Sequence, residues 1–252
     1  MCFYNSVNAT LAALAARYRK ESSLAESSKS DVESLCRVGA FSFSKSAVIT
    51  SSSQIEIFNW GLIPNWVKSE QSALEIRKGT VNARNDSVFV KPSFKNIIYN
   101  QRCIIPSTGY FEWRQEDKNK IPYFIFIPES KIFSMAGVYD KWVNPSTGEI
   151  INSYSIITTT TNPLTDYIHN TKHRMPVILS KENELKWLDS NLNKESIEKL
   201  MIPYNAKKMD AYILNDGFLK KDPHDISLLE KYDPVNENKS QINKSLFDDL
   251  NL

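Results

Sequence analysis

The residues at the start of the chain, Met1 and Cys2, are the first whose types and positions could do chemistry. If the initiator methionine is removed, Cys2 carries a free α-amine and a thiol on adjacent carbons. The amine can attack an aldehyde to give an imine, and the thiol can then close onto the imine carbon as a five-membered thiazolidine. Reference pKa values, roughly 7.7–8.0 for the amine and about 8.5 for the thiol, leave part of the amine unprotonated near neutrality. The alternative is that Cys2 is simply a small residue after the start.

A second polar group is the run Asn82-Ala83-Arg84. In an extended segment, an amide and a guanidinium two residues apart point to the same side. The planar donor fork of arginine suits a phosphate or carbonyl ligand. The alternative is a hydrogen-bonded network or a surface pair.

A third group is Glu112, which lies among the aromatic residues Tyr110, Phe111 and Trp113. If this carboxylate faces a pocket, loss of solvent raises its pKa and makes it a candidate general acid or base. The alternative is that Glu112 faces water on the polar side of an edge strand.

The segment from Ile168 to Pro176 contains His169, His173 and Arg174. Histidine is the side chain whose ordinary pKa lies nearest neutrality. The four-residue separation of the two histidines could indicate a metal pair, but no third ligand is nearby, so the sequence predicts no metal. Arg174 could bind phosphate or support the site. None of this chemistry requires a cofactor.

An aromatic turn at residues 60–66 contains Trp60 and Trp66. An exposed tryptophan near basic residues such as Lys68 and Lys95 could stack on a nucleobase. The alternative is that both tryptophans belong to the core.

Composition limits the classes of function. The 252 residues carry a formal net charge of +2, so overall charge does not indicate nucleic-acid binding. The three cysteines lack CxxC spacing, which argues against a zinc site or a disulfide framework and fits a reducing compartment. The chain has no apolar run of 18 residues and no secretion signal, so we expect a cytoplasmic protein that does not bind membranes.

Several elements must position these residues. Helical spacing predicts a helix over residues 6–20 with Asn8 as its cap, and shorter helices over 70–78, 163–167, 182–190 and 194–201. β-branched and aromatic residues predict strands over 55–60, 102–105, 110–114, 123–127, 133–138, 153–159 and 210–214. The fold expected is a strand-rich α+β domain over residues 1–235, with a partly closed antiparallel sheet and peripheral helices, followed by a polar tail over 236–252.

The polar clusters, in this order, resemble the SRAP family of SOS-response-associated peptidase-like proteins, which includes the abasic-site sensor that forms DNA–protein crosslinks. The matching motifs span roughly residues 2–215 and are Met1-Cys2, residues 60–66, Asn82-Ala83-Arg84, residues 102–106 leading into 109–113, Thr158-Thr159, and Ile168-His169 with Arg174-Met175-Pro176.

The resemblance implies a positively charged cleft for single-stranded DNA, in which Cys2 attacks the ring-opened aldehyde of an abasic deoxyribose. It implies that the crosslink shields the lesion during the DNA damage response. The active-site amide, carboxylate and imidazole of the family fall on Asn82, Glu112 and His169. The DNA-contacting arginine falls on Arg84 and the wedge-like tryptophan on Trp66, and we expect Lys95 and Arg174 to add DNA contacts. The expected partner is single-stranded DNA with abasic sites, bound by a monomer.

Two features depart from the family pattern. Phe3 and Tyr4 stand where many members have Gly-Arg, which removes a phosphate contact expected from that arginine. The spacing from histidine to Arg174 is longer, which leaves His169 and His173 as candidates, and we choose His169 because it follows the apolar Ile168.

Two other functions are compatible with the residues. An N-terminal cysteine can be an acyl-transfer nucleophile that uses its own α-amine as the base, which would make the chain a thiol peptidase or amidase, including an autoproteolytic one. No oxyanion-hole glycine motif lies near a candidate nucleophile. A non-catalytic nucleic-acid reader would use Trp66 and Arg84 alone.

Overall fold

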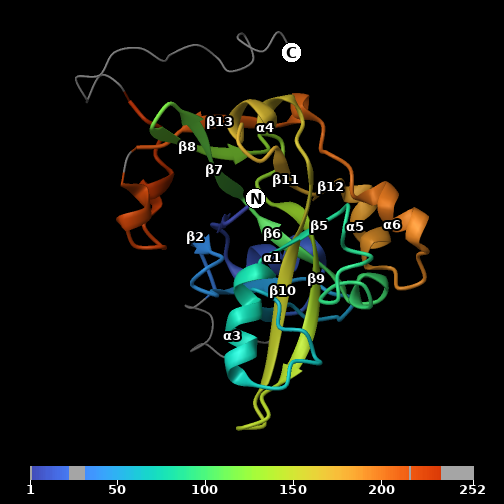
Figure 1. Ribbon diagram of the computed structural model, residues 1–252. Coiled ribbons are helices and arrows are strands. Elements are labelled where there is room, and N and C mark those ends of the chain that lie inside the picture. The colour runs from blue at the N-terminus through green and yellow to red at the C-terminus, as the bar shows by residue number, and fades with distance from the viewer. Residues whose placement is uncertain (1, 23–31, 216, 234–252) are drawn as a thin grey trace.

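In the computed structural model, the described residues 2–22, 32–215 and 217–233 form two β-sheets with helices around them (Figure 1). The smaller sheet is antiparallel throughout and has five strands. In spatial order these are β13 (Asp210–Ile213), β8 (Asn119–Phe126), β7 (Gly109–Glu116), β1 (Tyr4–Val7) and β2 (Leu35–Gly39).

The larger sheet is organised around two long neighbouring strands, β9 (Phe133–Val143) and β10 (Ile150–Thr160), joined by the turn at residues 144–149. Its strand order is β12 (Ile178–Leu179), β9, β10, β4 (Glu56–Trp60) and β3 (Lys45–Val48). Three more strands pair with the long ones: β5 (Asn82–Arg84) and β11 (Arg174–Pro176) with β10, and β6 (Arg102–Ser107) with β9. β10 runs parallel to β4 and β5, so this sheet is mixed.

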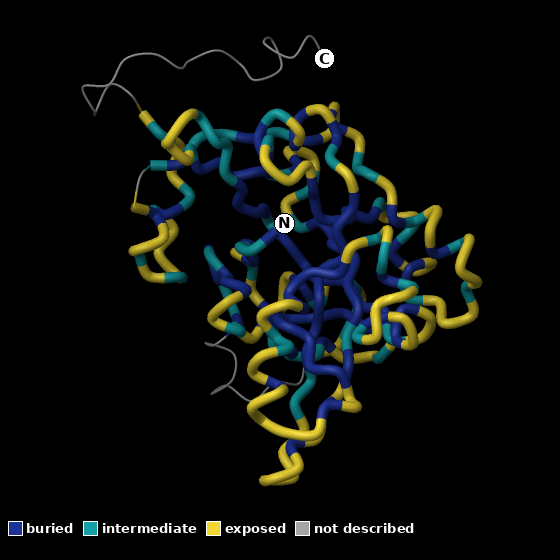
Figure 2. Tube along the Cα trace, in the orientation of Figure 1, coloured by how far each residue is buried: buried dark blue, intermediate teal, exposed yellow. Residues whose placement is uncertain are grey.

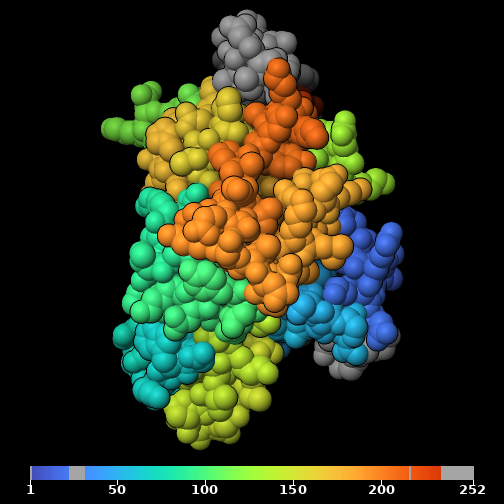
Figure 3. Space-filling view, turned by 90° about the vertical axis from the view of Figure 1, so that its right-hand side faces the viewer, coloured from blue at the N-terminus to red at the C-terminus, as the bar shows by residue number. Residues whose placement is uncertain are grey.

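The helices are short and lie at the periphery (Figure 1). They are α1 (Leu11–Tyr18), α3 (Glu70–Gly79), α4 (Pro163–Ile168), α5 (Lys181–Leu188) and α6 (Lys194–Leu200), with 3₁₀ turns at Ile97–Tyr99, Ala206–Lys208, Phe218–Lys220 and Ile226–Leu229. Asn162 starts α4 with a capping box, and Pro163 occupies the first turn, where no backbone donor is needed. Figure 3 shows α5 and α6 lying beside the segment near residue 90, where Lys194 Nζ stands 5.3 Å from the ring of Phe89.

The core lies between and within the two sheets, and Figure 2 shows the chain start beside this buried centre. Alternate residues of β7 belong to different apolar clusters: Tyr110 packs into the main core, whereas Phe111 packs with Phe124 and Phe218. This alternation follows from the two-residue period of a strand. Cys2 belongs to the main core.

The predicted α+β class is confirmed, with the strands divided between two sheets. The helix predicted over residues 6–20 is wrong at its start, because residues 4–7 form β1 and pair on both sides with β7 and β2. The helix begins after Thr10, not Asn8, and Thr10 Oγ1 accepts a hydrogen bond from Ala13 N at 3.2 Å. β2 was not predicted. The tail predicted over residues 236–252 lies outside the described residues. No described helix is long and apolar enough to cross a membrane.

Candidate active site and nucleic-acid interface

Four predicted residues converge where the two sheets meet. Cys2 lies two residues before the start of β1, Glu112 lies on β7 of the small sheet, and Asn82 begins β5 of the large sheet. His169 ends α4 as its C-cap. All four side chains are buried, with exposed fractions of 8% or less. The structure therefore brings together residues from four separate parts of the sequence.

Asn82 links the large sheet to the chain start. Its Nδ2 donates a hydrogen bond to the carbonyl oxygen of Cys2 at 2.8 Å. The parallel pairing of β5 with β10 places Asn82 opposite Ile156, and Trp60 Nε1 holds the preceding carbonyl, that of Val81, at 2.8 Å. Asn82 Oδ1 is buried and accepts no hydrogen bond from the described residues. The amide therefore fixes Cys2 while keeping an acceptor at the site.

Glu112 is buried on an inner strand. β7 lies between β8 and β1, and the exposed fraction of Glu112 is 4%, which excludes the alternative of a water-facing edge position. Burial raises the pKa of Glu112 to about 7, because the charged form loses solvation. At neutral pH this carboxyl group therefore has substantial populations of both protonation states, as a general acid or base requires.

His169 faces Glu112 through its Nε2 atom. Nδ1 stands 2.7 Å from the carbonyl oxygen of Arg174, which can only accept, so the neutral ring carries its proton on Nδ1. Nε2 is then the unprotonated nitrogen, 3.9 Å from Glu112 Oε2. Burial lowers the pKa of His169 to about 4, so the ring is neutral at pH 7. His169 thus offers an acceptor on the side of the carboxyl group.

The thiol of Cys2 is held in its protonated form. Burial first, and then the charge of Glu112, raise the pKa of this thiol above its ordinary value. The Sγ atom lies 3.7 Å from the carbonyl oxygen of Tyr4, to which the thiol donates.

A pocket of about 440 Å³ opens beside Glu112 and His169. Its walls combine the apolar residues Phe3, Trp113 and Leu219 with polar and basic ones, which are Gln115, Lys120, Thr171 and Lys172. An anionic ligand with apolar parts suits such a lining.

Two tyrosines beside this site were missed from the sequence. The hydroxyl groups of Tyr110 and Tyr154 are buried; that of Tyr110 has no hydrogen-bond partner among residues 2–22, 32–215 and 217–233, whereas that of Tyr154 lies beside the Ser46 side chain. The charge of Cys2 is among the causes, after burial, that raise the pKa of each phenol. Strand alternation could have indicated Tyr110, which lies two residues before Glu112 on the same face of β7.

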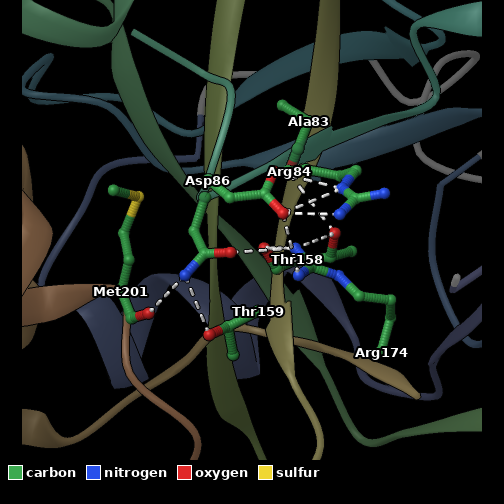
Figure 4. Close-up of polar contacts among 8 residues, drawn as sticks. Ala83, Arg84, Asp86, Thr158, Thr159, Arg174 and Met201 are labelled. Carbon is green, nitrogen blue, oxygen red and sulfur yellow. Dashed lines mark hydrogen bonds and ion pairs between the residues drawn. The ribbon is translucent and has the colours of Figure 1, made fainter.

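Arg84 lies in a second, more exposed cluster (Figure 4). Its guanidinium forms a forked pair with Asp86, with Nη2 2.5 Å and Nε 3.2 Å from Oδ2. Arg174 Nη1 stands 3.7 Å from the same oxygen. Arg174 itself is buried, and its Nη2 donates to the Thr158 carbonyl at 2.6 Å and to Asn85 Oδ1 at 2.9 Å. Asp86, for which the sequence predicted no role, lies between two predicted DNA-binding arginines.

The remaining predicted DNA-binding residues lie elsewhere. Trp66 is 47% exposed in the loop between β4 and α3, whereas Trp60 is buried. Lys95 is exposed in the segment before the first 3₁₀ turn. Within the described part of the chain, no hydrogen bond, ion pair or ring contact joins Trp66 or Lys95 to the cluster around Cys2.

His173 lies outside the site. It is exposed, adopts a left-handed backbone conformation with φ of 50°, and its Nδ1 lies 2.6 Å from Asp166 Oδ1. Residues 2–22, 32–215 and 217–233 contain no group of three or more potential metal ligands.

Comparison with known proteins gives three kinds of match. The sequence profile of the SOS response associated peptidase (SRAP) family matches residues 1–217. The abasic site processing protein YoqW of Bacillus subtilis is 40% identical over 164 residues, which is 64% of this chain and 70% of that protein. The abasic site processing protein HMCES of Gallus gallus is 33% identical over 150 residues, 52% of this chain and 44% of that protein. A crystal structure of a Bacteroides thetaiotaomicron protein superposes with a TM-score of 0.90 at 52% identity, covering 92% of this chain and all of that one.

Proposed function

This chain belongs to the SRAP family, and we propose that it processes abasic sites in single-stranded DNA by forming a covalent thiazolidine through Cys2. Relatives from Bacillus subtilis and Gallus gallus are named abasic site processing proteins, which supports the substrate. The observation that carries the proposal is the convergence of Asn82, Glu112 and His169 on the start of the chain at the junction of the two sheets.

In the proposed reaction, the aldehyde oxygen leaves as water. After removal of Met1, the α-amine of Cys2 adds to the aldehyde carbon of the ring-opened sugar to give a carbinolamine. Loss of water gives the imine, and addition of the Cys2 sulfur to the imine carbon closes the thiazolidine while the nitrogen gains a proton. The hydrogen bond from Asn82 to the Cys2 carbonyl fixes the direction in which amine and thiol are presented.

Glu112 and His169 divide the proton transfers. Protonated Glu112 donates to the departing carbinolamine oxygen, and the resulting carboxylate accepts the thiol proton as sulfur attacks. A pKa of about 7 suits both steps. His169 presents an unprotonated Nε2 that can accept the proton of the sugar hydroxyl during ring opening. The 3.9 Å between the two groups leaves them close enough to act on one bound sugar.

Binding to the DNA strand involves the basic groups outside the buried cluster. Arg84 contacts phosphate, and Trp66 stacks on a base. Lys95 and Arg174 are weaker candidates, because Lys95 has no contact with the site and Arg174 is buried in a structural network. The covalent product stays on the DNA, which shields the fragile site from strand cleavage.

The peptidase alternative has less support from the site. Reactive cysteines usually have a lowered thiol pKa, because the thiolate is the nucleophile. Burial raises the pKa of Cys2 instead, which is compatible with an amine that attacks first.

Intact-mass analysis tests the proposal. The full chain with a C-terminal tag is mixed with single-stranded DNA that carries one abasic site. We expect a species with the mass of the protein lacking Met1 plus DNA minus one water. Cys2→Ala and Cys2→Ser should each give an adduct only after borohydride trapping of the imine, because both keep the α-amine and lack the thiol that closes the ring. A peptidase or a non-covalent reader would give no adduct with any variant.

A further inference from the structure

The loop at residues 170–173, between His169 and Arg174, is fastened to β7 by one side chain. Asn170 Oδ1 accepts from the Gln115 backbone N–H at 3.0 Å, and Asn170 Nδ2 donates to the Gln115 carbonyl at 2.9 Å. β1 pairs with β7 only at residues 109–111, so the Gln115 groups lie on a stretch of strand edge that β1 leaves uncovered. The amide of Asn170 thus takes the place of a strand partner. We call this pair of bonds the Asn170 clip.

Further contacts hold both ends of the loop. Arg114 donates to the Tyr167 carbonyl and lies over the Tyr167 ring at 3.9 Å, which ties the end of α4 to β7. His169 Nδ1 contacts the Arg174 carbonyl, and His173 pairs with Asp166 on α4. The loop is therefore fixed at its start, middle and end, and Glu112 lies on the same strand as the clip.

Lys172 is the positively charged residue in this fixed loop that lies at the pocket. It is exposed, it lines the 440 Å³ pocket together with Glu112 and His169, and it forms no ion pair with any residue in the described ranges. Its positive charge is also among the causes, after burial, that lower the pKa of His169. In contrast, Arg84 is already neutralised by Asp86. Lys172 is therefore an unpaired positive charge beside the reacting groups.

We propose that Lys172, held over this pocket by the Asn170 clip, binds the DNA phosphate beside the abasic nucleotide. The inference rests on the proposed function, because a sugar that reaches Cys2 must carry its flanking phosphates past Glu112 and His169. An ammonium group acts on phosphate as a point charge, so the contact adds affinity without reading sequence.

The test uses undamaged single-stranded DNA and fluorescence anisotropy over a series of salt concentrations. Lys172→Ala should weaken binding at low salt and reduce the log–log salt slope by about 0.7, the contribution of one phosphate. The fall in affinity between 50 and 200 mM salt then becomes about 2.6-fold smaller. Lys172→Arg should restore the slope, and Lys199→Ala on α6, an exposed lysine outside the pocket, should leave it unchanged. An unaltered slope in Lys172→Ala would overturn the proposal.

The role of the clip is tested by a double-mutant cycle with Asn170→Ala. Lys172→Ala should change the slope less in the Asn170→Ala background, because the lysine is no longer held over the pocket. Equal changes in both backgrounds would overturn the assignment of the clip. Wild-type protein is assayed in parallel for adduct formation with abasic DNA. Lack of an adduct there would reject the crosslinking function only, because the slope is measured on DNA without a lesion.

Discussion

The cluster around Cys2 and the cluster around Arg84 differ in how their charged groups are compensated. Glu112 and His169 are buried, and loss of solvent raises the pKa of Glu112 and lowers that of His169, so that the neutral form of each is favoured. Arg84 and Asp86 are about half exposed and neutralise each other at 2.5 Å. Buried groups with shifted pKa values are suited to moving protons, whereas an exposed pair costs little to open, on the order of 0–1 kcal/mol. Under the proposed function, the first region carries out the chemistry and the second binds DNA reversibly.

Blocking the amine of Cys2 should have the largest effect. An uncleaved N-terminal tag should abolish adduct formation, because the thiol alone cannot form the imine, whereas a C-terminal tag should have no effect. Gel analysis after heating in denaturant measures the adduct. A heat-stable adduct from the N-terminally blocked protein would show that the thiazolidine mechanism is wrong.

Glu112→Gln should slow single-turnover adduct formation by about 10²–10⁴-fold, the usual contribution of a proton-transfer group. The wild-type rate should fall as pH rises above about 7, where Glu112 loses its proton, although the amine becomes more available. The variant should lack this decline.

The same substitution should stabilise the fold at alkaline pH. The pKa of Glu112 is higher in the folded protein than its ordinary 4.5, so folding retains a proton that the unfolded chain releases. Stability contributed by this group is therefore present below about pH 4.5 and is lost as pH rises through about 7, by up to about 3 kcal/mol. Thermal unfolding at pH 8 should show a higher Tm for Glu112→Gln. An unchanged Tm would indicate that the carboxylate is better solvated than its burial implies.

His169→Ala should slow adduct formation or its reversal by about 10²–10⁴-fold, since it removes the acceptor beside Glu112. His173→Ala is the matched control, because His173 is exposed and paired with Asp166, and it should change the rate little. A chelator should affect neither protein. A larger loss in His173→Ala would transfer the role to the second histidine.

Opening the Arg84–Asp86 pair should have the smallest effect, and it should strengthen DNA binding, whereas the substitutions at the buried site weaken adduct formation. Asp86→Asn should raise affinity for single-stranded DNA a few-fold and steepen the salt slope by up to about 0.7, since Arg84 then meets phosphate without competition. Arg84→Ala should weaken binding and flatten the slope. If Asp86→Asn weakened binding, Asp86 would be orienting Arg84 toward the DNA instead of competing with it.

The sequence predicted those helices and strands whose formation depends on residues close together in the chain. The start of α4 followed from Asn162 and Pro163, and the strand around Glu112 followed from its aromatic neighbours. The helix predicted over residues 6–20 starts too early, because residues 4–7 form β1. Local spacing does not show this strand, since β1 pairs with β7 about 100 residues away. The parallel pairing of β5 with β10 was equally hidden.

The candidate site residues were easier to single out from the sequence than their side-chain partners. Cys2 stood out by its position directly after Met1, whereas Asn82, Glu112 and His169 stood out because polar residues interrupted apolar runs. The pairing of Asp86 with Arg84 was not visible, since a surface ion pair leaves no periodic signal. The Asn170 clip joins residues 55 positions apart through a side chain and a backbone, which no local spacing encodes.

The burial of Cys2 has a consequence for the order of events during synthesis. Under the proposed function, an aminopeptidase must remove Met1, and the segment that follows Met1 is open to it until β1 is enclosed between β2 and β7. β7 begins at Gly109, about 100 residues after β1, which corresponds to roughly 5–20 s of translation. The long sequence separation of these strands therefore gives the ribosome-bound chain an interval in which its first residue is accessible, and folding then ends that interval.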